Sequence, residues 1–219
     1  MGCNSSKAFE ADKEIVLSTQ FGNTNPLSWN VTIPGNTFTV VANKAHKLEA
    51  GVVQDQSGNV LLEVRQARNA KTVSFHEPGT GKTVLLVCKV KQGNYITRKE
   101  ARWSLYTDEN ISGGEKEVTE TGASMYRFGT FKTIPKGYVT EPIQYFYGTS
   151  SVPTMTSKFR NMAGTKATVW ASDGVTPGAV VENMKFPYYL NGTCTFAQGV
   201  DPLISFVMAT TFLSMNDNA

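Results

Sequence analysis

The sequence predicts a mostly β domain, either a sandwich or a barrel, that ends in a single hydrophobic helix. Two observations predict the strands. β-Branched and aromatic residues dominate the chain, and Gly, Asn and Pro interrupt it about every 8 to 12 residues. The third observation is an apolar run near the C-terminus, from Leu203 to Met215, which leaves no clean polar face. A helix that is apolar nearly all round must be buried on most sides, which favours a barrel wrapped around it.

Twelve strands are expected, several of them joined in hairpins. Glycine-containing turns separate the two strands of VVQDQSGNVLLEVRQ and of VSFHEPGTGKTVLLVCKV, as tight hairpin turns require. The polar stretches 108–124 and 148–166 are expected to be surface loops. The strands are expected at 29–33, 36–42, 49–55, 59–65, 71–76, 83–90, 102–107, 124–131, 138–147, 166–172, 178–186 and 192–197.

The expected helix spans about 201–215. Asp201 is a good N-cap, and Pro202 suits the first helical turn, where its missing N–H costs nothing. We expect one domain over 21–219, preceded by a flexible segment at 1–20.

Composition and charge indicate an ordinary globular protein and give no sign of nucleic-acid binding. The chain has 219 residues, of which 40% are hydrophobic and 18% charged, as in ordinary globular proteins. The net charge of +3 is too small to indicate a nucleic-acid partner. The charge is unevenly distributed, however, because the segment 65–102 is basic and the segment 108–120 is acidic.

Cysteines and histidines give no support for a metal site, a cofactor or an enzyme. Cys3, Cys88 and Cys194 are an odd number without CxxC spacing, so neither a disulfide framework nor a zinc site is expected. Cys88 and Cys194 are predicted to be small buried side chains. The two histidines, His46 and His76, have no partner motif for general acid–base catalysis.

The stretch HEPGTGKT at residues 76–83 resembles a phosphate-binding loop. That loop needs a glycine where this sequence has His76, and it must open a helix. Thr83 instead leads into VLLVCKV, which has the composition of a strand. A hairpin turn is therefore expected here.

The basic segment is the better candidate for a binding site. Lys89 and Lys91 alternate with Cys88 and Val90, so both lysines are expected on the outward face of a strand. Three further cations follow across a short turn and suit an anionic headgroup. The alternative is an ordinary solvated edge strand, on which lysines prevent aggregation. The additional cations are Arg98, Lys99 and Arg102.

The N-terminus MGCNSSK fits the pattern for N-myristoylation at Gly2. Because one myristoyl chain binds membranes only marginally, Cys3 is the expected second acylation site, for palmitate. The alternative is a chance match in a disordered end. The sequence shows neither a secretory signal peptide nor a membrane-spanning run. We therefore expect the protein on the cytoplasmic face of a membrane, the plasma membrane being favoured.

Three features together resemble the tubby C-terminal-like superfamily, specifically its LURP-one-related branch. They are the hairpin repeats, the run LLVCKVKQGNYITRKEARWSLY and the ending GVDPLISFVMATTFLSM. The resemblance implies a closed antiparallel β-barrel of about twelve strands around a central C-terminal helix. It also implies phosphoinositide binding through basic surface side chains, here Lys89, Lys91, Arg98, Lys99 and Arg102. The final helix is similar to that of phospholipid scramblases.

The leading hypothesis is a non-enzymatic, acylated, monomeric protein that binds anionic lipid headgroups at a membrane surface. The second hypothesis is a membrane-tethered adaptor whose loops at 108–124 and 148–166 bind a protein partner. A scramblase-like activity is the third.

Overall fold

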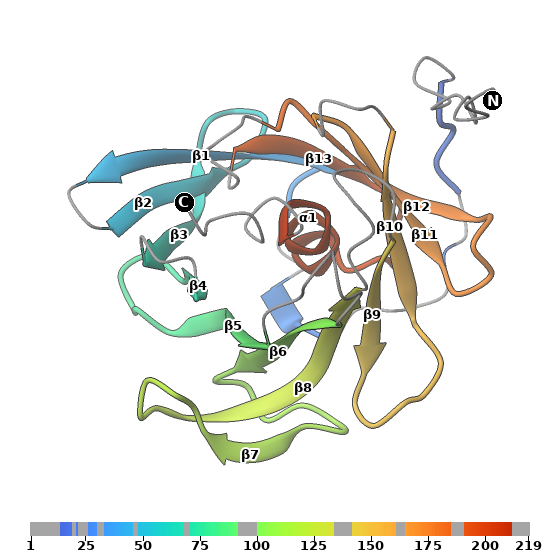
Figure 1. Ribbon diagram of the computed structural model, residues 1–219. Coiled ribbons are helices and arrows are strands. Elements are labelled where there is room, and N and C mark those ends of the chain that lie inside the picture. Colours follow the sequence, from blue (N-terminus) through green and yellow to red (C-terminus); the bar gives the residue numbers. More distant parts are fainter. Residues whose placement is uncertain are drawn as a thin grey trace, which may run out of the picture.

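The computed structural model describes most of the chain as one β-barrel with a helix inside it (Figure 1). The described residues are 14–18, 21, 26–29, 33–45, 48–67, 71–91, 100–133, 142–160, 165–184 and 191–211. The elements are β1 (Thr37–Ala45), β2 (Leu48–Gln54), β3 (Val60–Ala67), β4 (Thr72–His76), β5 (Thr83–Lys91), β6 (Ala101–Thr107), β7 (Glu115–Val118), β8 (Ser124–Thr133), β9 (Ile143–Tyr147), β10 (Met155–Phe159), β11 (Ala167–Ala171), β12 (Pro177–Glu182), β13 (Gly192–Phe196) and α1 (Pro202–Thr211).

Twelve of these strands form a closed ring. Neighbours follow one another from β6 back through β5, β4, β3, β2 and β1 to β13, and then down through β12, β11, β10 and β9 to β8. The additional pairing of β6 with β8 closes the ring, and every pairing is antiparallel. The strand β7 pairs with β8 outside the ring. The predicted closed antiparallel barrel of about twelve strands is therefore confirmed.

The helix α1 fills the middle of the barrel (Figure 1). It contacts strands β9 to β13, and its side chains Leu203, Ile204 and Phe206 are completely buried. The ring of Phe206 packs against Phe38 of β1 with 5.8 Å between ring centroids. An apolar helix is stable here because strands surround it on all sides. No helix in the described part of the chain has the length and apolar character to cross a membrane.

The start of the helix confirms the prediction made from its sequence. Asp201 Oδ1 accepts a hydrogen bond of 2.8 Å from the backbone N–H of Ile204, and Pro202 is the first helical residue. The carboxylate thus satisfies one of the N–H groups that a helix leaves unpaired at its N-terminus. Residues 212–215, the predicted last turn, lie outside the described residues.

Eleven of the twelve expected strands correspond to strands in the structure, and the differences lie in polar or short segments. The expected strand at 29–33 is wrong at its described positions, since Trp29 lies in a single 3-10 turn and Ile33 precedes β1. The expected loops are also partly wrong, because 108–124 contains β7 and 148–166 contains β10. These two strands were missed because EKEV and MTSKF are polar and short.

The glycine turns between β2 and β3 and between β4 and β5 confirm the predicted hairpins. Gly58, Gly79 and Gly81 all have positive φ, at 85°, 78° and 69°. The N–H of Glu77 donates to the carbonyl of Lys82 across the second turn, at 2.9 Å. HEPGTGKT is therefore a strand end and a hairpin turn, as expected.

The N-terminal residues lie against the outside of the barrel and then close one of its ends. The N–H of Ser18 donates to the carbonyl of Pro177, at the start of β12, with a distance of 3.1 Å. Phe21 is buried against Gly178, where an added Cβ would come within 2.4 Å of its ring. Further along, Trp29 packs edge-on against Phe38 inside the barrel. Within the segment expected to be flexible, Leu17 and Ser18 thus contact the barrel, whereas Val16 is 79% exposed.

Candidate functional site

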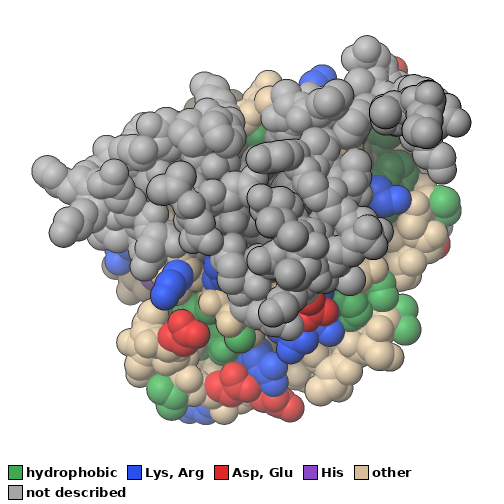
Figure 2. Space-filling model, in the orientation of Figure 1, with side chains coloured by type: hydrophobic (Ala, Val, Ile, Leu, Met, Phe, Trp, Pro, Cys, Tyr) green, Lys and Arg blue, Asp and Glu red, His purple; other side chains and the backbone are tan. Residues whose placement is uncertain are grey.

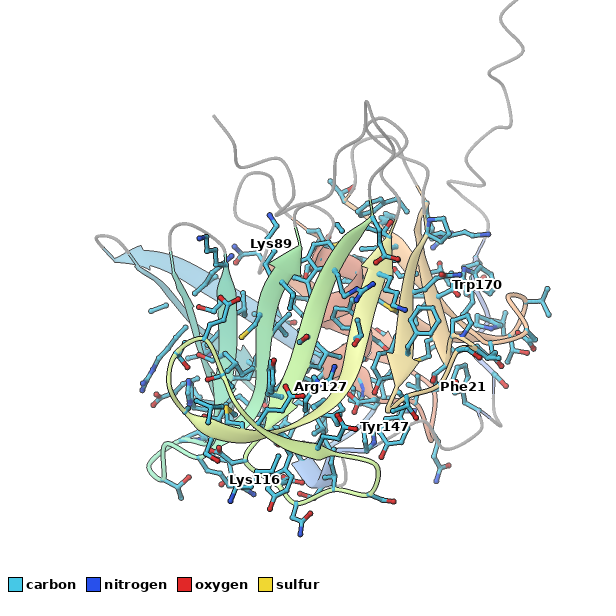
Figure 3. The ribbon with its side chains drawn as sticks, turned by 60° about the horizontal axis from the view of Figure 1, so that its bottom comes forward. Phe21, Lys89, Lys116, Arg127, Tyr147 and Trp170 are labelled. Atoms are coloured by element: carbon cyan, nitrogen blue, oxygen red, sulfur yellow. The ribbon has the colours of Figure 1, made fainter. Side chains whose placement is uncertain are left out.

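The two ends of the barrel carry opposite charge. We call the end where β5 finishes and β6 begins the basic end, and the opposite end the acidic end. Figure 3 shows Lys89 near the upper, basic end and Lys116 at the lower, acidic end. Among the charged residues whose side chains are described, the basic end carries Lys71, Lys89, Arg102, Lys132, Lys158, Arg160 and Lys166 against Glu100 and Glu182, a net charge of +5.

The acidic end has the reverse balance. Its three basic residues are outnumbered by nine acidic ones, which gives a net charge of −6 among the described side chains. Glu63 and Arg65 lie between the ends and pair with each other at 3.1 Å. Glu14, in the N-terminal segment, is counted at neither end. The acidic end carries Lys82, Lys116 and Arg127 against Asp55, Glu77, Asp108, Glu109, Glu115, Glu117, Glu120, Asp173 and Asp201.

The residues predicted from the sequence to bind headgroups fall partly within the described chain. Lys89 and Lys91 lie at the end of β5, and Arg102 lies at the start of β6. In the antiparallel register Lys91 is opposite Arg102, so two of the predicted cations are neighbours across strands. Arg98 and Lys99, in the connection between β5 and β6, lie outside the described residues, as do the acylation candidates Gly2 and Cys3.

The expected outward orientation of Lys89 is wrong. The register pairs Lys89 with Trp103, a core residue that is 2% exposed, so Lys89 shares the inner face of β5 with Leu85 and Val87. Cys88 lies instead on the outer face, buried in a small second cluster with Leu86, Tyr106 and Met125. Cys88 is buried on this outer face because the hairpin of β7 and β8 covers it from outside.

Lys132 of β8 is a neighbour of Arg102 that sequence reasoning missed. The two residues are directly opposite each other across β6 and β8, and Lys91 flanks Arg102 on the other side. We call these three residues, Lys91, Arg102 and Lys132, the basic row. The signal for Lys132 could not be read from the sequence, because β7 and its loops separate β8 from β6 along the chain.

Arg102 and Lys132 place like charges side by side, which destabilises a sheet unless something offsets it. Two contacts offset the repulsion. Arg102 forms an ion pair with Glu100 at 2.7 Å, and Lys132 Nζ lies 4.4 Å from the ring centroid of Phe146. Both side chains nevertheless remain partly exposed. A guanidinium next to an ammonium on an open surface can bind phosphate oxygens, with Arg contributing a two-pronged contact.

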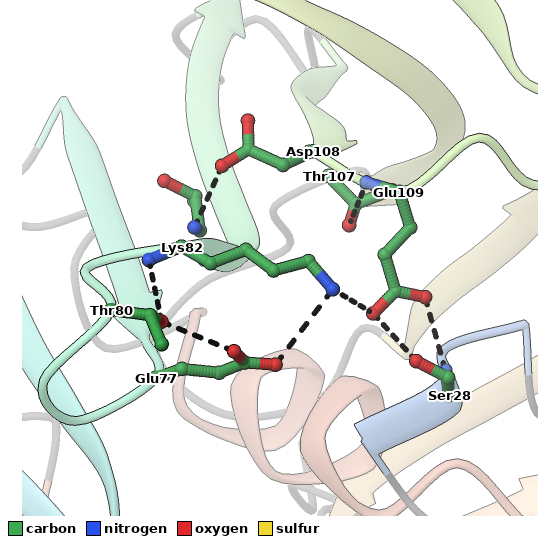
Figure 4. A network of polar contacts seen from close by, with 8 residues as sticks. Ser28, Glu77, Thr80, Lys82, Thr107, Asp108 and Glu109 are labelled. Atoms are coloured by element: carbon green, nitrogen blue, oxygen red, sulfur yellow. Dashed lines mark hydrogen bonds and ion pairs between the residues drawn. The ribbon is translucent and has the colours of Figure 1, made fainter.

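Lys82, the lysine of the stretch that resembles a phosphate-binding loop, forms ion pairs with two carboxylates. Figure 4 shows Lys82 between two carboxylates, with Nζ 3.7 Å from Glu77 Oε1 and 3.3 Å from Glu109 Oε1. Glu109 also accepts hydrogen bonds from the Ser28 hydroxyl at 2.7 Å and from the Ser28 N–H at 3.2 Å. This network joins the turn after β4, the loop after β6 and the N-terminal segment. Its role is structural.

The pKa of Glu109 reflects that network. Burial alone would raise the pKa of this carboxyl, but the hydrogen bonds from Ser28 and the nearby Lys82 outweigh burial and lower it. The charged form of Glu109 is therefore the one that the fold stabilises.

The described cysteines are buried thiols, as predicted. Cys88 is 1% exposed and Cys194 is 0% exposed. Burial raises the pKa of Cys88 to about 11 and raises the pKa of Cys194 as well, so neither forms a thiolate at neutral pH. Within the described ranges no three His, Cys, Asp or Glu side chains are grouped so as to hold a metal ion.

Comparisons with known proteins add little to this geometry. No family model matches the sequence, and no curated protein matches it. The chain is similar to a solved structure, a protein from Arabidopsis thaliana determined by X-ray diffraction. The two share 11% sequence identity over 89% of this chain and 98% of that one, with a TM-score of 0.49. The function must therefore be inferred from the residues of this chain.

Proposed function

We propose that this protein is a membrane-anchored lipid-binding barrel whose basic end contacts anionic headgroups. The observation that carries the proposal is the separation of charge, with a net +5 at the basic end and −6 at the acidic end among the described side chains. A negative membrane surface attracts each nearby Lys or Arg by about 1 kcal/mol and repels carboxylates. Such a surface favours one orientation of the barrel, with the basic end against the lipid.

Acylation at Gly2 and Cys3 would supply membrane affinity that the basic side chains of the barrel do not provide by themselves. Gly2 lies sixteen residues before Ser18, the position where the chain is hydrogen-bonded to β12. An extended chain of that length reaches about 55 Å, enough to serve many orientations of the barrel. The fatty chains therefore hold the protein at the membrane, while the charges select which end meets it. Membership of the tubby C-terminal-like superfamily, which the closed barrel around a helix supports, is part of this proposal.

A matched pair of lysines tests the headgroup contact. Lys132 at the basic end lies over the ring of Phe146, and Lys116 at the acidic end lies over the ring of Tyr126. Replacing Lys132 with Gln removes about 1 kcal/mol of attraction, so binding to vesicles containing phosphatidylserine or phosphatidylinositol bisphosphate should weaken about fivefold. The Arg102→Gln and Lys132→Gln double variant should lose roughly thirtyfold. Flotation of the full acylated chain measures both.

The control variant is Lys116→Gln, which removes the same charge at the other end. Its binding should equal that of the wild type, and neither variant should differ on vesicles of phosphatidylcholine alone. Equal losses for Lys132→Gln and Lys116→Gln would show that only the net charge matters, and would overturn the oriented contact. Binding indifferent to anionic lipid would overturn the headgroup proposal entirely.

The anchor is tested separately by Gly2→Ala, which prevents myristoylation. We expect the variant to move from the membrane to the soluble fraction of cells, because basic residues alone bind weakly at physiological salt. Mass spectrometry of the N-terminal peptide shows directly whether Gly2 and Cys3 carry acyl groups. An unchanged membrane fraction for Gly2→Ala would refute the anchor without refuting the headgroup contact.

A further inference from the structure

We propose that β7 is a docking edge on which an extended, basic peptide segment of a partner protein adds as a further strand. Every ring strand has at least two hydrogen-bonded neighbours, and β8 has three, whereas β7 pairs with β8 alone among the described residues. Figure 1 shows β7 as the outermost strand, away from the ring. A strand with one open side presents unpaired N–H and C=O groups that can bind an extended chain.

The hydrogen-bonding register shows which backbone groups face the open side. The N–H of Thr119 donates to the carbonyl of Ala123 at 2.8 Å, which makes this a hydrogen-bonded pair at the end of the hairpin. Hydrogen-bonded and non-hydrogen-bonded pairs alternate along an antiparallel ladder. In the register of β7 and β8, Glu117 and Glu115 therefore bond toward β8. The N–H and C=O groups of Val118 and Lys116 point to the open side.

The open edge of β7 is exposed to solvent and carries an apolar side chain that a docked strand can contact. Val118 is 74% exposed, which is unusual for a valine on a strand. Glu115 and Lys116 are exposed as well. An added strand would cover the Val118 side chain while its backbone pairs with that of β7, so both hydrogen bonding and burial would favour docking.

The surrounding charge favours a basic partner. On the face shown in Figure 2, acidic side chains gather in the lower part, over β7 and β8, interleaved with Lys and Arg. Arg127 is shared between Glu115 at 2.8 Å and Glu117 at 2.9 Å, and Glu120 at the tip of the hairpin is exposed. With the net charge of −6 at this end, the field attracts a positively charged segment and repels an acidic one.

Symmetry argues against a second copy of this chain as the occupant. Two β7 strands related by a two-fold axis run antiparallel only if the axis is perpendicular to the sheet, so residues of equal parity face each other. Centred on Lys116, that pairing sets Lys116 opposite its own copy and Glu115 opposite Glu117. Centred on Glu117, it sets two Glu117 side chains together. Centred on Val118, it avoids like charges but sets Glu117 and Lys116 opposite Thr119 and Glu120, which lie beyond the strand in the hairpin turn. Like charges directly opposite destabilise a strand pair, so a heterologous basic segment fits better.

This inference goes beyond the proposed lipid binding and does not depend on it. Because β7 lies at the acidic end, a barrel whose basic end rests on a membrane leaves this edge exposed to the aqueous side. One molecule could then hold a peptide segment near the membrane surface.

A proline substitution tests the open edge without breaking the hairpin. In Val118→Pro the missing N–H is one that faces away from β8, and proline is tolerated at such edge positions. The matched control is Val118→Thr, which keeps the N–H and the β-branched shape. We expect wild type and Val118→Thr to select Lys- and Arg-rich peptides with alternating β-branched residues from a phage library of random nine-residue peptides. Val118→Pro should lose this selection.

Amide hydrogen exchange of the full chain, read by NMR, distinguishes docking at β7 from binding elsewhere. A selected peptide should slow the exchange of Lys116 and Val118, while Glu117, already bonded to β8, should not change. Binding should weaken at high salt. Selection of the same peptides by Val118→Pro, selection of acidic peptides, or protection confined to other strands would overturn the proposal. So would a stable dimer in sedimentation that Val118→Pro abolishes, since that would make a second copy the occupant.

Discussion

Glu109 is the residue on which the polar network of the acidic end depends. Its carboxylate accepts two hydrogen bonds from Ser28 and contacts Lys82, although its side chain is only 12% exposed. Three segments far apart in the sequence meet at this one group. The sequence predicted nothing of this, because Glu109 lay in what was expected to be a solvated loop.

The lowered pKa of Glu109 leads to a pH-dependent prediction. A carboxyl whose pKa is lower folded than unfolded stabilises the fold above about pH 4.5, and that stabilisation is lost as the pH falls further. We expect Glu109→Gln to reduce the free energy of unfolding by about 1–2 kcal/mol near neutral pH. The gap from the wild type should narrow as the pH falls below about 4.

Urea unfolding at several pH values measures this gap. The exposed Glu120 supplies the control, since Glu120→Gln should change stability by less than about 0.5 kcal/mol at any pH. A gap for Glu109→Gln that stays constant from neutral to acidic pH would show that the carboxylate charge is not what stabilises the network.

At the scale of elements, the strands that alternate hydrophobic and polar residues were predictable, and those with other patterns were not. EKEV in β7 has one apolar residue, so nothing in its pattern marks it as a strand. It forms one because β8 continues past its pairing with β9, and the edge of β8 that this leaves open offers a partner. Lys89 shows the other failure, because alternation fixes which residues share a face but not which face is inside.

The contact between the N-terminal segment and β12 yields a second prediction. A Cβ on Gly178 would lie 2.4 Å from the ring of Phe21, which must then move away. We expect Gly178→Ala to lower the free energy of unfolding by about 1–3 kcal/mol, as overpacking does. In a Phe21→Ala background the same substitution should be nearly neutral, because the ring that it meets is gone.

Chemical denaturation of the four proteins in this cycle measures the coupling. Limited proteolysis near residues 14–21 should also become faster in Gly178→Ala if the segment leaves the barrel. Equal effects of Gly178→Ala with and without Phe21 would show that the two residues do not interact.

At the scale of the whole molecule, the barrel fold places basic side chains at one end and acidic side chains at the other. Along the sequence, these charges appear only as a basic segment followed by an acidic one. Antiparallel strands return repeatedly to the same two ends, so basic residues within β5, β6, β8 and β10, or directly next to β4, β10 and β11, meet at one end. This topology gives the two ends their net charges of +5 and −6 among the described side chains. No single segment of the sequence shows that difference.

The sequence by itself determined the strands of alternating pattern, the hairpin turns at their glycines and the buried helix with its Asp201 cap. These follow from local chemistry: side-chain periodicity, the positive φ of glycine and the unpaired N–H groups of a helix start. Only the tertiary structure decided that β6 closes the ring on β8, that Lys132 stands beside Arg102, and that β7 keeps an open edge. Those are pairings between residues distant in the chain, and no local pattern encodes which strands will meet.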